Sequence, residues 1–270
     1  MSDESITTEG KIKNMSIAVE FLNISKRFPN ANYNALEDVN LSIKEGELIT
    51  ILGTSGCGKT TLLKMVNRIF DPDSGEIRLF GKDIKEMDSV KLRRGIGYVI
   101  QQIGLFPHMT IYNNIATVPK ILGWDKKRIS DRVEELFQLV NLDSVEFKSR
   151  YPAQLSGGQQ QRIGLARALA VDPDVMLFDE PFGAIDAINR ENLQDELLRI
   201  HEKSKKTFLF VTHDINEAFK LGTRVLIMDK GQVKQFGTPR EILNNPADEF
   251  VTALIKSAEK QYFVQDGGGI

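Results

Sequence analysis

The stretch GTSGCGKT, residues 53–60, decides the fold. It fits the pattern G-x-x-x-x-G-K-[ST], which forms a phosphate-binding loop when a strand precedes it and a helix follows. The nearly continuous apolar run ELITIL, residues 47–52, predicts a central strand that is covered on both faces. The segment KTTLLKMVNRI, residues 59–69, predicts the helix. This order of strand, loop and helix predicts an α/β fold of the P-loop NTPase kind, with a parallel sheet flanked by helices.

The loop residues have different expected roles toward a nucleotide. Glycines let backbone N–H groups surround an anion, and the helix N-terminus adds its positive dipole. Lys59 is expected to reach the β- and γ-phosphates, and the Thr60 hydroxyl to ligate Mg²⁺. Cys57 has two interpretations: a redox switch, or a small residue that the turn tolerates. We favour the second. The nucleotide-binding residues predicted here are Gly53, Thr54, Ser55, Gly56, Cys57, Gly58, Lys59, Thr60 and Thr61.

Two further strands end in residues suited to phosphate chemistry. The apolar run at residues 175–178 leads into Asp179 and Glu180, and a second run, FLFVT, leads into His213. Parallel strands of an α/β fold present their carboxyl ends to the ligand, so these side chains are expected near the loop. We expect Asp179 to hold Mg²⁺, and Glu180 to orient and deprotonate the attacking water. His213 would hydrogen-bond the γ-phosphate and hold Glu180 in place. The alternative for Asp179 and Glu180 is that they only cap the next helix. The alternative for His213 is a hydrogen-bonded structural histidine.

The segment LSGGQ, residues 155–159, resembles the signature motif of the ATP-binding cassette (ABC) family. Other motifs of that family follow in the right order over residues 16–245. Phe28 stands where the family stacks adenine on an aromatic ring. Gln101 matches the Q-loop, which implies a place among the catalytic residues and metal ligands, and Asp186 matches the D-loop. The resemblance thus implies an ATPase that uses ATP and Mg²⁺, and His213 corresponds to the family's switch histidine.

The resemblance also implies that one chain is half of an enzyme. In this family two cassettes associate head to tail, and each ATP lies between the loop of one and the signature of the other. Ser156, Gly157, Gly158 and Gln159 open a helical stretch, so their N–H groups and the serine hydroxyl would form a second anion-binding helix terminus. We therefore expect these residues to act on the ATP of a second copy of the chain.

Composition limits the setting and the partners. The 270 residues are 41% apolar and 27% charged, with a net charge of −2, which predicts no nucleic-acid partner. A single cysteine fits a reducing compartment. The sequence shows no apolar run of about 20 residues that could cross a bilayer, and its first residues show no hydrophobic signal core. We expect a peripheral protein on the cytoplasmic face of the membrane, held there by a permease.

The chain divides into three predicted parts. Residues 1–14 read as a polar tail, 15–245 as the nucleotide-binding domain with an antiparallel N-terminal β-subdomain, and 246–270 as a closing helix and tail. Within the domain, about 103–172 predict a helical subdomain, because strand patterns fade there. Val133, Leu136, Phe137 and Val140 follow helical periodicity. His108 is expected in a loop, and His201 on a solvated helix face.

Three functions are compatible with such a cassette: the ATPase of a membrane importer, a cassette of DNA repair or the ribosome, and a regulatory module without hydrolysis. Only 120 residues separate Lys59 from Asp179, too few for the long coiled coil of repair cassettes, and ribosomal types carry two cassettes. Glu180 and His213 are both present, which argues against the third. Exporters often fuse membrane helices to the cassette, and the absence of such helices favours an importer or a multi-subunit exporter.

The finer resemblance is to the ATPases of osmoprotectant uptake, which import quaternary amines such as glycine betaine, carnitine and choline. It rests on segments such as MVNRIFDPDSGEI, LSGGQQQRIGLARALA and NPADEFV. It implies permease subunits and, indirectly, an extracytoplasmic binding protein. Many of these ATPases continue into a regulatory CBS module; this sequence ends at Ile270, so we expect no such module. An importer of another small solute, such as an amino acid, and a non-transport regulatory ATPase remain the alternatives.

The segment IGLFPHMT, residues 103–110, follows Gln101 closely. Phe106 and Pro107 are apolar residues on an expected loop, flanked by polar ones. We hypothesise that Phe106, Pro107 and His108 line a groove for a short permease helix. The alternative is that Phe106 packs into the core of the helical subdomain.

Overall fold

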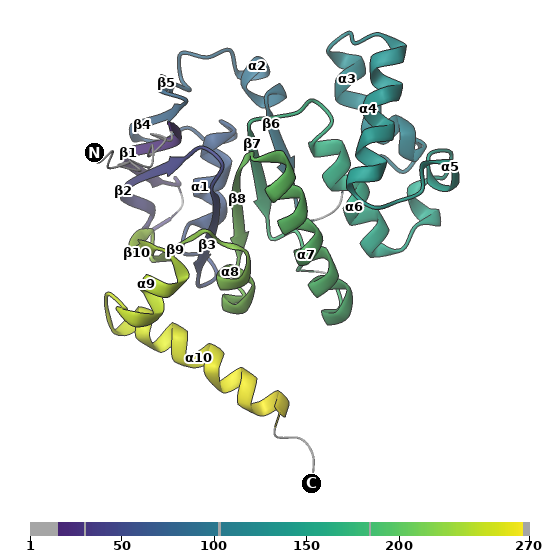
Figure 1. Cartoon of the computed structure of the whole chain (residues 1–270). Coiled ribbons are helices and arrows are strands. Elements are labelled where there is room, and N and C mark those ends of the chain that lie inside the picture. Colours follow the sequence, from purple (N-terminus) through teal and green to yellow (C-terminus); the bar gives the residue numbers. More distant parts are fainter. Residues whose placement is uncertain (1–15, 30, 102–103, 184, 267–270) are drawn as a thin grey trace, which may run out of the picture.

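The computed structural model describes residues 16–29, 31–101, 104–183 and 185–266, with the backbone only at 187–189 and 258–266. The tail predicted for residues 1–14 therefore lies outside the described residues. Two sheets and two groups of helices make up the described part, as Figure 1 shows.

The strands fall into a small antiparallel sheet and a larger, mostly parallel one. The small sheet has the order β2-β1-β4-β5, and the large sheet the order β10-β9-β3-β8-β7-β6, in which β10 alone runs antiparallel to its neighbour. The bounds of the strands are β1 (Ile17–Arg27), β2 (Asn34–Lys44), β3 (Leu48–Gly53), β4 (Ser74–Leu79), β5 (Lys82–Asp83), β6 (Ile96–Val99), β7 (Val175–Asp179), β8 (Thr207–Thr212), β9 (Arg224–Asp229) and β10 (Gln232–Gly237).

The helices cover both faces of the large sheet and form a separate group beyond β6. Their bounds are α1 (Lys59–Val66), α2 (Ser89–Arg94), α3 (Ile111–Ile121), α4 (Lys126–Leu139), α5 (Ser144–Phe147), the 3₁₀ turn η1 (Pro152–Gln154), α6 (Gly157–Ala168), α7 (Ala187–Ser204), α8 (Ile215–Leu221), α9 (Pro239–Asn244) and α10 (Glu249–Asp266). Among the helices described, none combines the length and apolar character that crossing a membrane requires.

The strand predicted at residues 47–52 is confirmed as the centre of the large sheet. Every residue of β3 is buried, because parallel neighbours flank it and both of its faces are covered. Ile49 and Ile51 join the apolar cluster shared with α1 and the small sheet, whereas Leu48 packs toward the helical side. This two-sided burial explains why the strand reads as a continuous apolar run instead of an alternating one.

The register of the large sheet brings the predicted site residues to one edge. In the parallel ladders Leu52 pairs with Thr212, and Asp179 pairs with Val211. The carboxyl ends of β3, β7 and β8 are therefore level, and the phosphate-loop sequence, Glu180 and His213 follow them directly. This is the place where open parallel sheets bind ligands.

A group of helices, α3 to α6, lies between β6 and β7 in the chain and at one end of the molecule in space (Figure 1). The predicted amphipathic helix is α4 with its C-cap Val140, and its four apolar positions are fully buried. Asp125 begins this helix by accepting a hydrogen bond from the Arg128 N–H. The predicted fold class is confirmed, while the limits of the subdomain, about 103–172, stay a prediction.

The prediction for His201 is wrong. Its ring packs edge-on against Phe208, with the ring centroids 4.9 Å apart, and burial lowers the pKa of the imidazole. His201 lies four residues after Leu197 on the buried stripe of α7, so helical periodicity places it against the sheet. His108, by contrast, lies on an exposed turn as expected.

Candidate functional site

The phosphate-loop sequence forms a tight turn between β3 and α1. Gly58 has φ of 105°, and a Cβ there would lie 2.3 Å from the Ala35 carbonyl oxygen, so only glycine fits. The Lys59 ammonium is buried under the loop and donates to the carbonyl oxygens of Gly53 and Thr54, at 2.8 and 2.9 Å. A lysine has three donors, so this one is held at the centre of the loop with a donor to spare.

Cys57 packs inside this turn. A Cβ on Gly53 would meet its sulfur at 2.7 Å, and only 3% of the Cys57 surface is exposed. Burial raises the pKa of the thiol, which disfavours the reactive thiolate. The geometry supports the interpretation of Cys57 as a small packing residue.

A cavity of about 290 Å³ opens beside the loop. Phe28 lies on its wall, and the Phe70 ring holds it edge-on at 5.2 Å between centroids. Tyr33, which is 66% exposed, faces the same cavity and was not predicted from the sequence. Predicted residues from the loop, from α1 and from the turn after β7 also line the cavity: Ser55, Gly56, Gly58, Lys59, Thr60, Thr61 and Glu180. The tertiary structure therefore brings an aromatic wall, the loop and the second strand-end carboxylate together.

The first strand-end carboxylate, Asp179, contacts the start of α1. The Thr60 hydroxyl donates to Asp179 Oδ1 at 2.7 Å, and the Tyr98 hydroxyl donates to Oδ2 at 3.3 Å. Lys64 approaches the same oxygen at 3.9 Å. Burial and the neighbouring carboxylate raise the pKa of Tyr98, so its phenol stays a donor at neutral pH. Gln101 is different: it is exposed, and within the described residues it makes no hydrogen bond to Thr60 or Asp179.

Glu180 and His213 form a pair across the ends of β7 and β8. Glu180 Oε2 lies 3.2 Å from His213 Nδ1, and the histidine is the more exposed of the two. Glu180 has φ of 47°, a left-handed conformation that is uncommon outside glycine and often found at functional sites. Its backbone N–H donates to the Val211 carbonyl oxygen, so the strained turn is anchored to β8.

The segment LSGGQ lies away from this cavity. Ser156 caps α6, where its hydroxyl accepts from the Gln159 N–H at 3.3 Å and the Gln159 carboxamide oxygen accepts from the Ser156 N–H at 2.9 Å. Gly157 and Gly158 follow at the accessible start of the helix, and a Cβ on either would meet nothing within 4 Å. None of these four residues lines the cavity. Asp186 is likewise outside it, exposed in the turn before α7.

Comparison with known proteins agrees with this arrangement. The family model described as ABC transporter matches residues 36–183, which is more than half of the chain. The chain belongs to the ABC transporter family. It is 52% identical over 240 residues to the osmoprotectant import ATP-binding protein OsmV of Salmonella typhimurium, covering 88% of this chain but 63% of OsmV. The chain thus spans less than two thirds of that relative.

Two further comparisons extend this result. The glycine betaine uptake system ATP-binding protein YehX of Escherichia coli is 49% identical, over 89% of this chain and 77% of YehX. The ATP-binding cassette MJ0796, solved as a dimer in a post-hydrolysis state with ADP and Pi, superposes with a TM-score of 0.72. It is 35% identical, over 82% of this chain and 99% of MJ0796.

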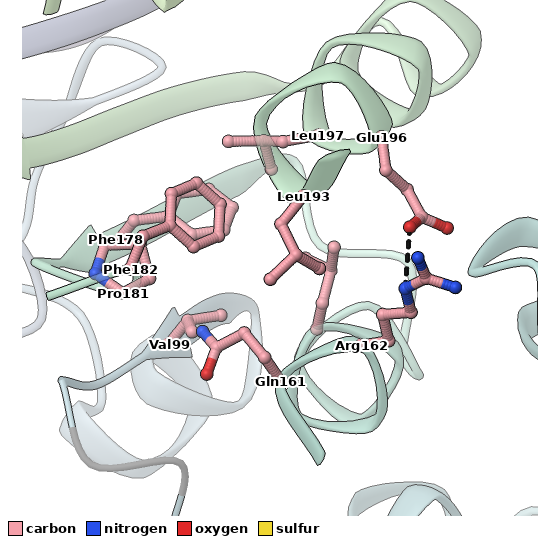
Figure 2. Close-up of a pocket in the computed structure, with 10 residues that line it drawn as sticks. Val99, Gln161, Arg162, Phe178, Pro181, Phe182, Leu193, Glu196 and Leu197 are labelled. Atoms are coloured by element: carbon pink, nitrogen blue, oxygen red, sulfur yellow. Dashed lines mark ion pairs between the residues drawn. The ribbon is translucent and has the colours of Figure 1, made fainter. Parts of the chain in front are cut away.

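The signature helix of this cassette is tied to α7. Arg162 Nε donates to Glu196 Oε2 at 2.9 Å, and Figure 2 shows the two side chains pointing toward one another from α6 and α7. Beside them is a cavity of about 10 Å³, lined by apolar side chains that include Pro181 and Phe182. These two residues follow Glu180 directly, so α6 and the turn that carries the candidate base line the same small cavity.

A third and larger cavity lies at the edge of the cassette, between α2 and the helical group. It measures about 500 Å³ and is mostly apolar, with Val90, Phe106 and Ile121 exposed along it. We call it the edge groove. Phe106 is 38% exposed and lies outside the core clusters, so the alternative that it packs into the core is wrong. Pro107 and His108 do not line the groove, which corrects that part of the hypothesis.

Sequence reasoning missed the residue that shapes the Phe106 turn. Asn114 is fully buried, accepts from the Phe106 N–H, and donates to the carbonyl oxygens of Phe106, Met109 and Thr110. These bonds close the turn, and Phe106 lines the groove whereas Pro107 and His108 do not. A buried asparagine inside an apolar helix pattern was the available signal.

Proposed function

We propose that the chain is the ATP-hydrolysing subunit of an ABC importer for a quaternary-amine osmoprotectant. The catalytic part of the proposal rests on one cavity, which Lys59, Thr60 and Glu180 all line. Asp179 accepts a hydrogen bond from the Thr60 hydroxyl at this cavity. The substrate class rests on the resemblance and on the names of relatives such as OsmV and YehX.

The residues of the cavity suit ATP. The loop N–H groups and Lys59 would bind the phosphates, since both are donors held at a helix start. Phe28 would stack on the adenine, and the exposed Tyr33 ring stands close enough to share that role.

Thr60 and Asp179 fit a magnesium ion. They supply two oxygen atoms already 2.7 Å apart, which are the hard ligands that Mg²⁺ prefers. The described residues contain no group of three His, Cys, Asp or Glu side chains that could hold a metal, so phosphate and water oxygens would have to complete the shell. Bound there, Mg²⁺ would neutralise charge on the phosphate oxygens. Gln101 stays a predicted ligand that has to move toward the pair.

Glu180 is our candidate general base. One of its oxygens is held by His213, which leaves the other free to accept a proton from water. The backbone of Glu180 is anchored to β8 by its bond to the Val211 carbonyl oxygen, and its side chain is held by His213. His213 is mostly exposed, so its other ring nitrogen is available to a γ-phosphate.

We further propose that two copies assemble head to tail. Ser156, Gly157 and Gly158 are accessible at a helix start yet absent from the cavity of their own chain, so they can act on another copy's ATP. The dimeric form of MJ0796 supports this. Asp186, exposed before α7, would face the same partner.

A permease helix would dock in the edge groove, which is mostly apolar and is lined by Phe106. Replacing Phe106 with serine should leave basal ATP hydrolysis largely intact and abolish its stimulation by transported solute. Loss of ATP binding in this variant would contradict the docking role.

The whole proposal can be tested on the native complex. The tagged chain is purified from its own membranes with its partners and reconstituted into proteoliposomes that contain ATP. Uptake of radiolabelled glycine betaine, carnitine and choline is compared with uptake of amino acids, and the Glu180→Gln variant is the control. Uptake of a quaternary amine that the control lacks supports the proposal. Uptake of an amino acid alone indicates another importer, and hydrolysis of ATP without uptake of any of these solutes indicates a regulatory ATPase.

A further inference from the structure

Tyr98 is a side chain that joins two parts of the molecule with separate proposed roles. It lies on β6, the edge strand of the large sheet, and its hydroxyl reaches Asp179 on the neighbouring strand at 3.3 Å. Tyr98 also lines the edge groove. Among the residues that line that groove, Tyr98 is the one whose hydrogen bond ends on Asp179.

The contacts of Asp179 show what this bond does. A carboxylate turns easily about its last torsion, because that torsion has broad minima. Here Thr60 engages one oxygen and Tyr98 the other, so the two donors together define the plane of the group. Lys64 is 3.9 Å away, which adds charge but no directed bond. Without the Tyr98 hydroxyl, the orientation would depend on Thr60 alone.

We propose that Tyr98 is a positioning residue, which orients Asp179 for its cation and connects the edge groove to that carboxylate. This inference rests on the proposed function. The ring packs against the core beside α1. A partner in the groove would contact Tyr98, and the Tyr98 hydroxyl donates to Asp179, so the partner could shift that hydrogen bond.

The variant Tyr98→Phe isolates the hydroxyl because it keeps the ring. Binding of the fluorescent nucleotide TNP-ATP to the purified chain is measured in EDTA and over a Mg²⁺ titration. We expect unchanged affinity in EDTA and a Mg²⁺ midpoint raised about 3- to 10-fold, the effect of one hydrogen bond. A purely packing role would move neither value. The matched control is Tyr112→Phe, on α3 of the helical group.

A separate labelling experiment tests the connection between the edge groove and Asp179. A cysteine placed at Thr117, which lines the groove, is labelled with a bulky maleimide. The label should shift the Mg²⁺ midpoint when Tyr98 is present and have no effect with Tyr98→Phe. A cysteine at Val145, exposed on α5, is the labelling control. An equal shift in both backgrounds would overturn the connection.

The outcomes separate this inference from the proposed function. If Lys59→Ala binds TNP-ATP as well as the wild type does, the proposed nucleotide site is wrong. If the wild type responds to Mg²⁺ and Tyr98→Phe has an equal or lower midpoint, the positioning role alone is overturned.

Discussion

The ion pair between α6 and α7 offers a quantitative test of how the signature helix is held. Glu196 is 10% exposed and Arg162 25% exposed at the side chain. Glu196 Oε1 is buried with no hydrogen-bond partner among the described residues. The variant Arg162→Met keeps the aliphatic stem and the helix propensity but removes the cation that faces Glu196 (Figure 2).

The loss of unfolding free energy in Arg162→Met depends on whether Glu196 stays ionised or takes up a proton. Removing one partner of a buried pair costs about 3–5 kcal/mol when the remaining charge stays buried. Glu196 can avoid part of this by taking up a proton. Its ordinary pKa is 4.5, so protonation at pH 7 costs about 3.4 kcal/mol at 1.36 kcal/mol per unit. At pH 5 the same step costs about 0.7 kcal/mol.

Burial raises the pKa of Glu196, although the cations Arg162 and Arg199 oppose it, so the folded state binds this proton more tightly than the unfolded state. Stability from this group is therefore lost as the pH rises above 4.5. Losing Arg162 raises the pKa further. We expect Arg162→Met to lose about 2–3 kcal/mol of unfolding free energy at pH 7 and about 1 kcal/mol or less at pH 5.

Urea unfolding, followed by circular dichroism at both pH values, measures these differences. Glu196→Gln is the matched control, since it removes the charge and leaves the partly exposed Arg162, which also reaches the Asn141 carbonyl oxygen. We expect that control to lose about 1 kcal/mol, with little dependence on pH. An equal loss for Arg162→Met at pH 5 and pH 7 would refute the reasoning.

Three other substitutions test the proposed site. Glu180→Gln should slow turnover about 10²–10⁴-fold, as loss of a general base does, and should trap an ATP-bound dimer that elutes early in size-exclusion chromatography; a monomer under ATP would count against the sandwich. Ser156→Arg should stop hydrolysis while the single subunit keeps its TNP-ATP affinity, and a collapse of that affinity would contradict action on a second copy. Gly58→Ala should weaken TNP-ATP binding by at least about tenfold, because its φ is positive and the Cβ meets Ala35. Unchanged binding would show that the loop tolerates the side chain.

Much of the fold could be predicted because its signals are local. The glycine spacing of residues 53–60, the apolar run before it and the helical period of α4 each depend on neighbours along the chain. The placement of Glu180 and His213 also followed, since the carboxyl ends of adjacent parallel strands meet at one edge. His201 was misjudged because a polar residue on a buried helical stripe looks solvated in sequence.

What the sequence determined by itself was the kind of site and the types of residue in it. Only the tertiary structure decided which side chains touch. Tyr98 and Asp179 are 81 residues apart, and β6 lies beside β7 only because of the strand order. Arg162 meets Glu196 only because α6 packs on α7. Such contacts depend on register and helix packing, which arise from the whole core, and no short stretch of residues carries that information.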